Sequence, residues 1–150
     1  WGRPDMALFL FTKSIIENKP IKIFNNGNMT RDFTYIDDII EGLIRVIGKP
    51  PKANKEFNYL NPSLSSSWAP YRIFNIGNSR PTPLMEFINQ IEKNIGIKAK
   101  KDFYPMQPGD VSSTSADTSE LKKWIGFRPN TSIDKGISEF VNWYRKFYKC

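Results

Sequence analysis

Apolar and polar positions recur in two periods along the chain, and they predict helices that alternate with short strands. Residues 4–17 carry apolar side chains at the spacing of a largely buried helix, which Asn18-Lys19-Pro20 closes. Ile21 to Phe24 alternates in the way that is typical of a strand. A strong turn signal, Asn25 to Asn28, precedes a second predicted strand, Arg31 to Ile36.

The middle of the chain combines a helix, an irregular segment and a third strand. Asp37 and Asp38 begin a predicted helix that ends at Gly48, and their carboxylates suit the positive end of its dipole better than a role as an acid–base pair. Residues 49–71, rich in Pro, Ser and Asn, are long for a connection and indicate a functional or mobile loop. Arg72 to Asn78 is predicted to be a strand that ends in a turn.

The last third of the chain predicts three helices and one strand. The helices cover residues 81–96, 117–126 and 133–148, with Ser132 as the cap of the last one, and the strand covers 98–104. The alternation of helices with short strands indicates an α/β fold. Aromatic residues recur three and four apart on the last helix, which predicts that they belong to the core: Phe140, Trp143, Tyr144 and Phe147.

Length and composition bound the architecture. The 150 residues, with 39% hydrophobic and 14% aromatic side chains, predict one globular domain and leave no room for a second full domain. The longest apolar stretch, Met6 to Phe11, is far shorter than the roughly 20 residues that cross a bilayer, so no membrane segment is expected. A single cysteine, Cys150, excludes an internal disulfide, suits a reducing compartment and favours a cytoplasmic location.

The chain contains no histidine, and this narrows the chemistry that it can perform. The commonest zinc sites need histidine or several cysteines, so no metal site is expected. Ser-His-Asp and Cys-His nucleophilic mechanisms are excluded within this chain for the same reason.

The net charge of +7 raises the question of nucleic-acid binding. The basic residues are scattered, however, and only residues 98–101 and 144–149 are dense in positive charge. We therefore expect no nucleic-acid partner. A smaller anion such as a diphosphate needs only one or two well-placed cations, and it suits this distribution better.

An ordered set of motifs resembles a known family. The chain contains WGRPDMA, RDFTYIDDI, FNIGN before a proline and a helix, MQPGDV, and the closing GISEFVNWYRKFY. In this order they look like the C-terminal, substrate-binding portion of extended short-chain dehydrogenase/reductase proteins of the NAD-dependent epimerase/dehydratase family. Within it, WGRPDM and MQPGDV most resemble the UDP-glucuronate 4-epimerases. The resemblance covers nearly the whole chain except residues 49–71.

The resemblance implies a larger enzyme. Such enzymes bind NAD through a glycine-rich strand-to-helix turn and use a catalytic Ser or Thr with Tyr-x-x-x-Lys, all upstream of WGRPDM. No G-x-x-G-x-x-G and no Tyr-x-x-x-Lys in a matching context occur here. We therefore expect a truncated chain that lacks most of the Rossmann core, is inactive alone, carries no catalytic residue and binds no NAD, with the missing N-terminal Rossmann half as its partner.

The resemblance also implies which residues hold a UDP-sugar. Arg31 matches an arginine that contacts a phosphate, because its planar fork suits phosphate oxygens. Asp110, in the turn Gln107-Pro108-Gly109-Asp110, matches a carboxylate that accepts hydrogen bonds from the ribose hydroxyls. Gln107 stands where many relatives carry a second phosphate-binding arginine. The alternatives are that Arg31 is a solvated arginine at a strand end and that Asp110 belongs to an ordinary Pro-Gly turn.

Three further positions complete the predicted site. Lys22 and Phe24 match the strand that holds uracil, chiefly through main-chain groups, and Phe24 as plain core is almost equally consistent. Arg3 borders the sugar in the resembling epimerases, where its charge would favour a glucuronate carboxylate.

Other functions stay open at this point. The same fold could serve a nucleotide-sugar dehydratase, a decarboxylase or a different epimerase, and a binding or interaction module without chemistry is a further alternative. The helices at 4–17 and 37–48 are expected to face the missing half. Their apolar surface would then be exposed or covered by self-association, so a homodimer is a further expectation.

Overall fold

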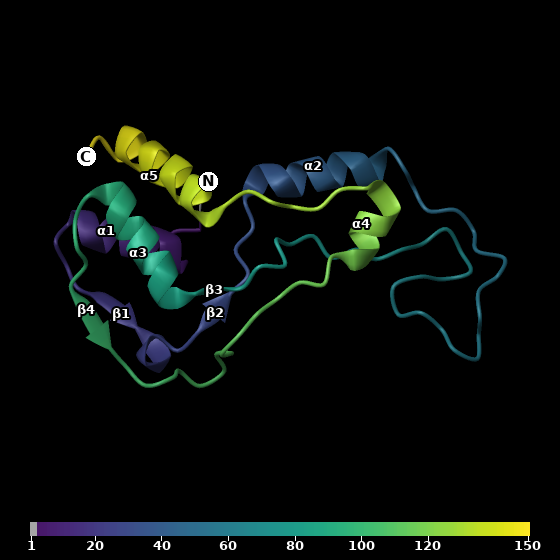
Figure 1. Ribbon diagram of the computed structural model, residues 1–150, viewed down its shortest axis with the longest axis horizontal. Helices are drawn as coiled ribbons and strands as arrows, with labels where there is room; N and C mark the ends of the chain where they lie inside the picture. Colours follow the sequence, from purple (N-terminus) through teal and green to yellow (C-terminus); the bar gives the residue numbers. More distant parts are fainter. Residues whose placement is uncertain (1–2) are drawn as a thin grey trace. The chain divides into compact units, whose positions relative to one another are not determined.

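The computed structural model describes residues 3–150 and separates them into two compact units (Figure 1). Trp1 and Gly2 of the WGRPDM motif lie outside the described residues. Both units are interleaved along the chain. Unit 1 comprises Trp1–Phe33, Arg80–Thr114 and Thr131–Cys150, and unit 2 comprises Thr34–Ser79 and Ser115–Asn130.

Unit 1 is built around three helices, α1 (Ala7–Ile16), α3 (Leu84–Ile95) and α5 (Ile133–Tyr148). Helix α3 packs against both α1 and α5. Its residues Phe87, Ile88 and Ile91 are at most 1% exposed and form the centre of the core. The apolar face that the sequence predicts for residues 81–96 is therefore the face that organises this unit.

Four short strands of unit 1 make two pairs. Strand β1 (Ile21–Ile23) runs parallel to β4 (Lys101–Phe103), with Ile21 opposite Lys101. Strand β2 (Thr30–Arg31) runs antiparallel to β3 (Thr82–Pro83), with Arg31 opposite Thr82. The β1 isoleucines are buried and Lys22 between them is exposed, as alternation in a strand requires.

Two predicted strands of unit 1 are shorter than expected. Phe24 begins the 3-10 segment η1 (Phe24–Gly27) and is not part of β1, because the chain turns through Asn25 and Asn26 at φ of 51° and 50°. The strand predicted for residues 31–36 ends after Arg31. Because the pair is antiparallel, the residue opposite Asp32 would be Pro81, which has no N–H to donate to the ladder.

The ends of the helices follow their local sequence signals. Helix α3 ends at Gly96, which has a φ of +82°. The Ser132 side chain accepts a hydrogen bond from the Lys135 N–H and caps α5. On α5, Tyr144 is buried as predicted, whereas Trp143 and Phe147 are 37% and 52% exposed, so the aromatic stripe is only partly core.

Unit 2 contains α2 (Ile36–Ile47) and α4 (Ser119–Ile125), which contact each other. Asp37 and Asp38 lie in the first turn of α2, and Asp38 accepts a hydrogen bond from the Asn130 N–H at 3.2 Å. Helix α2 exposes a stripe of large apolar side chains, which we call the α2 stripe: Ile36, Ile40, Leu43, Ile44 and Ile47. Their exposed fractions are between 45% and 69%.

The remainder of unit 2 is irregular. The strand predicted for residues 72–78 is wrong, because within the described residues this segment forms only one isolated bridge, between Arg72 and Ser66. The long segment 49–71 is tied by backbone hydrogen bonds from Asn54 to Trp68 at 2.9 Å and from Ile73 to Ser65 at 2.8 Å. It appears in Figure 1 as the extended blue-to-teal loop between α2 and α3.

Candidate functional site

Arg31 and Asp110, 79 positions apart in the sequence, meet in unit 1. The Arg31 Nη2 atom donates a hydrogen bond to the Asp110 Oδ1 atom at 2.8 Å. The two side chains are 25% and 32% exposed, so solvent reaches the pair but does not surround it. The structure thus brings together the two residues to which the resemblance assigns the phosphate and the ribose.

Strand β2 and the segment after Asp110 hold this pair in place. The Thr30 N–H donates to the Ser112 carbonyl at 2.9 Å, and the Thr114 N–H donates to the Thr30 carbonyl at 3.3 Å. The hydroxyls of Thr30 and Ser113 add a side-chain hydrogen bond at 2.7 Å. The Arg31 side chain therefore extends from a backbone that is held on both sides, by β3 and by residues 112–114.

Asp110 closes a tight turn. Its N–H donates to the Gln107 carbonyl at 3.2 Å, and Gly109 within the turn has a φ of +83°, a conformation that side chains with a Cβ disfavour. The Asp110 Oδ1 atom also accepts a hydrogen bond from the Val111 N–H at 3.0 Å. The carboxylate is therefore oriented by its own backbone before any ligand arrives.

The Arg31 guanidinium is oriented as well. Its Nη1 atom donates to the Thr30 carbonyl at 2.9 Å while Nη2 contacts Asp110. A guanidinium carries five N–H donors in a plane, so these two bonds leave further donors for an anion. An arriving phosphate would share the guanidinium with Asp110 or displace the carboxylate from it.

Tyr104 forms a second group with two predicted residues. Its N–H donates to the Ile23 carbonyl at 2.8 Å, which fixes it at the end of β4. The Tyr104 ring lies 5.8 Å from the Phe24 ring, and the Lys22 ammonium lies 5.9 Å from the centre of the Tyr104 ring. Lys22 and Phe24 are thus gathered around a residue that the sequence did not single out.

Gln107 and Arg3 differ in their surroundings. Gln107 is exposed and contributes its carbonyl to the Asp110 turn. Arg3 is exposed and forms an ion pair with Asp5 at 2.7 Å, and its hydrogen bond lowers the pKa of the Asp5 carboxyl. The predicted residues thus fall into a phosphate group (Arg31, Gln107 and Asp110), Lys22 and Phe24, which form an aromatic group with Tyr104, and Arg3 with its own partner.

The part of the chain that the structure describes, residues 3–150, has no cluster of three or more His, Cys, Asp or Glu residues that could hold a metal ion. Its one parallel strand pair, β1–β4, is not followed by a glycine-rich turn into an α-helix, so these residues do not fit the pyrophosphate of NAD. No helix among them is long and apolar enough to span a membrane.

Comparison with known proteins places the chain in a family. The model of the NAD dependent epimerase/dehydratase family matches residues 2–77, half of the chain. The chain belongs to this family. The motifs that carry the resemblance in the sequence, and the mixed α/β fold with short strands, are confirmed by this match and by solved structures of the family.

Curated relatives align with almost the whole chain. Protein CapI from Staphylococcus aureus is 49% identical over 149 residues, and a probable UDP-glucuronate 4-epimerase from Rhizobium meliloti is 42% identical over 153 residues. Each alignment covers 99% of this chain but only 45% and 44% of the relative. The chain therefore spans less than half the length of these curated relatives.

A solved structure shows the same fold. The UDP-glucuronic acid 4-epimerase from Bacillus cereus, in complex with UDP-glucuronic acid and NAD, superposes with a TM-score of 0.77 at 30% identity. The alignment covers 97% of this chain and 41% of that one. Almost the whole chain thus aligns with less than half of that epimerase.

Proposed function

We propose that this chain is the UDP-sugar-binding part of an NAD-dependent nucleotide-sugar epimerase that inverts C4 of UDP-glucuronate. The observation that carries the proposal is the contact between Arg31 and Asp110 at 2.8 Å. It gathers a phosphate-binding cation and a carboxylate that can accept from ribose hydroxyls, at positions far apart in the sequence. The similarity to UDP-glucuronate 4-epimerases over nearly the whole chain supports the choice of ligand.

In this proposal the phosphate group holds the diphosphate and the ribose. Arg31 donates to phosphate oxygens with the N–H groups that Asp110 and Thr30 leave free. Asp110 accepts from the ribose hydroxyls with the carboxylate oxygen that faces away from Arg31. Gln107 supplies a neutral amide in place of a second arginine, so most of the charge that meets the diphosphate comes from Arg31.

The aromatic group receives the base. Phe24 is half-buried beside the exposed Tyr104 ring, and both lie next to the backbone of β1 and β4. A uracil ring could contact these rings while its polar edge bonds to main-chain groups. Arg3, which is 73% exposed beside Asp5, is free to turn toward a glucuronate carboxylate at the cost of one exposed ion pair.

The chemistry itself is assigned to residues outside this chain. NAD supplies hydride transfer at C4, and the described residues do not fit it, so we propose that another part of the protein binds it. The residues of this chain hold the nucleotide handle, which fixes the sugar in place for reaction elsewhere. The chain alone is therefore expected to bind but not to turn over.

Features of unit 2 support a partner of this kind. The α2 stripe exposes five large apolar side chains, far more than an isolated surface helix usually presents. Residues 72–78 have the sequence pattern of a strand but find no ladder among the described residues. Both features are expected if another part of the protein supplies a sheet that residues 72–78 join and against which α2 packs. In the isolated chain, a second copy would cover the α2 stripe.

Calorimetry with UDP and UDP-glucuronate tests the proposal. We expect both to bind, and Arg31→Ala to weaken binding about 10- to 150-fold, because a hydrogen bond to a charged group contributes roughly 1.5–3 kcal/mol. Arg128→Ala, which removes an exposed arginine from unit 2, is the matched control and should leave the affinity unchanged. A folded chain that takes up neither ligand, or equal losses in the two variants, would overturn the proposal.

A further inference from the structure

The irregular segment 49–71 lines a cavity within unit 2 that is open to solvent. The cavity has a volume of 530 Å³, within the range of about 300–1,000 Å³ that small-molecule pockets occupy. Segment 49–71 supplies most of its lining, and the start of the next segment and helix α4 supply the rest. The side chains that matter for recognition are Lys49, Lys52, Asn54, Tyr71, Arg72 and Trp124.

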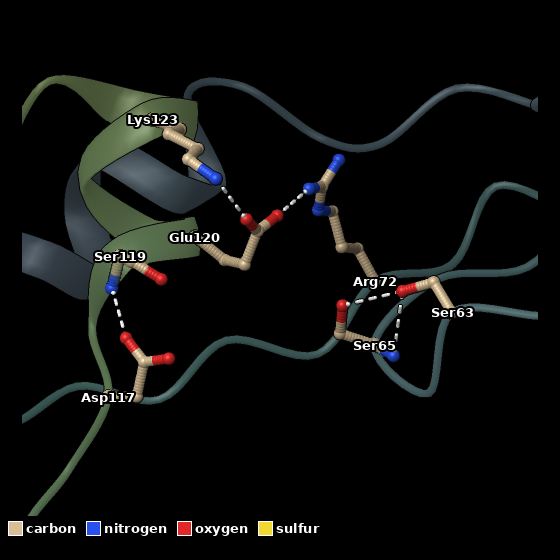
Figure 2. A network of polar contacts seen from close by, with 7 residues as sticks. All are labelled: Ser63, Ser65, Arg72, Asp117, Ser119, Glu120 and Lys123. Atoms are coloured by element: carbon tan, nitrogen blue, oxygen red, sulfur yellow. Dashed lines mark hydrogen bonds and ion pairs between the residues drawn. The ribbon is translucent and has the colours of Figure 1, made fainter.

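The charged residues of this lining are all cations. Lys49, Lys52 and Arg72 contribute three positive charges, and no aspartate or glutamate is among the lining residues. Arg72 is paired with the carboxylate of Glu120, which accepts hydrogen bonds from both Lys123 and Arg72 (Figure 2). These two bonds lower the pKa of Glu120 and keep it ionised, so one of the cations is balanced and two are not.

Two of the cations are held rigidly. Lys49 donates to the Trp124 carbonyl at 2.6 Å, and the Trp124 indole N–H donates back to the Lys49 carbonyl at 2.9 Å. The Arg72 guanidinium lies 4.7 Å from the centre of the Trp124 ring and is anchored at its other side by Glu120. Such fixed charges lose little entropy when an anion binds between them.

The third cation and two polar groups remain available. Lys52 is exposed and makes no hydrogen bond or ion pair within the described residues. The side-chain oxygen of Asn54 accepts a hydrogen bond from the Glu56 N–H at 3.1 Å, so the amide NH2 group of Asn54 points away from Glu56. Tyr71 is 52% exposed beside them and offers a hydroxyl.

We propose that this cavity is a binding site for a phosphate monoester, separate from the UDP-sugar site in unit 1. A phosphate monoester carries about 1.5–2 negative charges, which matches the two unbalanced cations better than a single carboxylate does. Lys52 meets the phosphate directly, Lys49 supplies the second unbalanced positive charge, and Tyr71 and Trp124 border its organic part. The proposal gives the long segment 49–71 a function: it forms the wall of this site.

Titration of the ¹⁵N-labelled chain with inorganic phosphate, glucose 1-phosphate and UMP tests the site. The titrations use an Arg31→Ala background, so that the unit 1 site does not contribute. We expect a saturable shift of the Trp124 indole N–H signal, which the Trp124→Phe variant assigns. If glucose 1-phosphate binds most tightly of the three, the ligand is a sugar phosphate. If UMP binds most tightly, the ligand is a nucleotide.

A matched pair of charge reversals decides whether the cavity is responsible. Lys52→Glu should weaken phosphate binding at least about tenfold, because it replaces an attraction by a repulsion at short range. Lys55→Glu makes the same charge change in the same segment but outside the cavity lining, and should change the affinity less than twofold. Equal effects of the two variants, or no saturable shift, would overturn the inference.

The outcome is independent of the proposed function. The Lys52→Glu chain with Arg31 intact is expected to bind UDP as the unmodified chain does. If the unmodified chain binds phosphate monoesters in this cavity but does not bind UDP, the UDP-sugar proposal is refuted and this site stands. If it binds UDP but shows no phosphate binding in this cavity, this site alone is refuted.

Discussion

Replacing Glu92 with glutamine tests what holds unit 1 together beneath its candidate site. Glu92 lies on α3, and its side chain is 1% exposed. It accepts hydrogen bonds from Lys98 at 2.7 Å, from the Ala99 N–H at 3.1 Å and from Lys101. Since Lys101 begins β4, this carboxylate ties the central helix to the strand that leads to Tyr104 and the Asp110 turn.

The magnitude follows from which of these bonds glutamine can keep. Its oxygen can still accept from the Ala99 N–H, but both charge-assisted bonds to lysine are lost or weakened. A hydrogen bond to a charged group contributes about 1.5–3 kcal/mol. Lys98 is 86% exposed and contributes little, whereas Lys101 is 22% exposed. We expect Glu92→Gln to lower the free energy of unfolding by about 2 kcal/mol.

The effect should depend on pH with a defined sign. Burial raises the pKa of Glu92, but the hydrogen bonds from Lys101, Lys98 and Ala99 outweigh it and leave the pKa below its ordinary value of 4.5. The stabilisation is therefore present above the pKa of the unfolded chain and is lost as the pH falls through the lower, folded value. The difference between wild type and Glu92→Gln should shrink as the pH falls below about 4.5.

Urea unfolding followed by circular dichroism, at pH 7 and at a series of acidic pH values, measures this difference. Glu139→Gln on α5 is the control, because Glu139 is exposed and its replacement should change stability by less than about 0.5 kcal/mol. The reasoning is refuted if Glu92→Gln is as stable as the control at pH 7, or if its deficit persists unchanged in acid.

Other predictions concern the site and the α2 stripe. Asp110→Ala should strengthen binding of pyrophosphate, because Arg31 loses a competing carboxylate, and should weaken binding of UDP, because the ribose loses its acceptor. Calorimetry with both ligands should show these two opposite changes. Changes in the same direction would contradict the assignment of Asp110 to the ribose. Ile44→Lys should leave the unfolding free energy within about 0.5 kcal/mol, because Ile44 is 59% exposed, and should reduce self-association in sedimentation experiments. An unchanged sedimentation coefficient for a chain that does self-associate would exclude the α2 stripe as the contact.

The helices could be predicted from the sequence because their signals are local. The positive φ at Gly96 and the serine cap at Ser132 are decided by a few neighbouring residues, and both lie where the sequence indicates. The strands depended on partners that local patterns do not reveal. Residues 31–36 and 72–78 both have strand-like patterns, yet the first pairs over one residue of its predicted range and the second not at all.

The candidate site divides in the same way. No spacing rule connects Arg31 with Asp110 across 79 positions, and only the family resemblance predicted that they serve one ligand. Tyr104 was missed although the predicted strand 98–104 ended on it. Its importance depends on the pairing of β4 with β1, which places it beside Phe24 and is not visible in either segment alone.

A structure of the chain determined with UDP bound tests the central claim most directly. We expect the diphosphate within hydrogen-bonding distance of the Arg31 guanidinium, a ribose hydroxyl on the Asp110 carboxylate, and the base beside Phe24 and Tyr104. A nucleotide bound elsewhere on the chain, with the Arg31–Asp110 contact intact and no phosphate near it, would contradict the account.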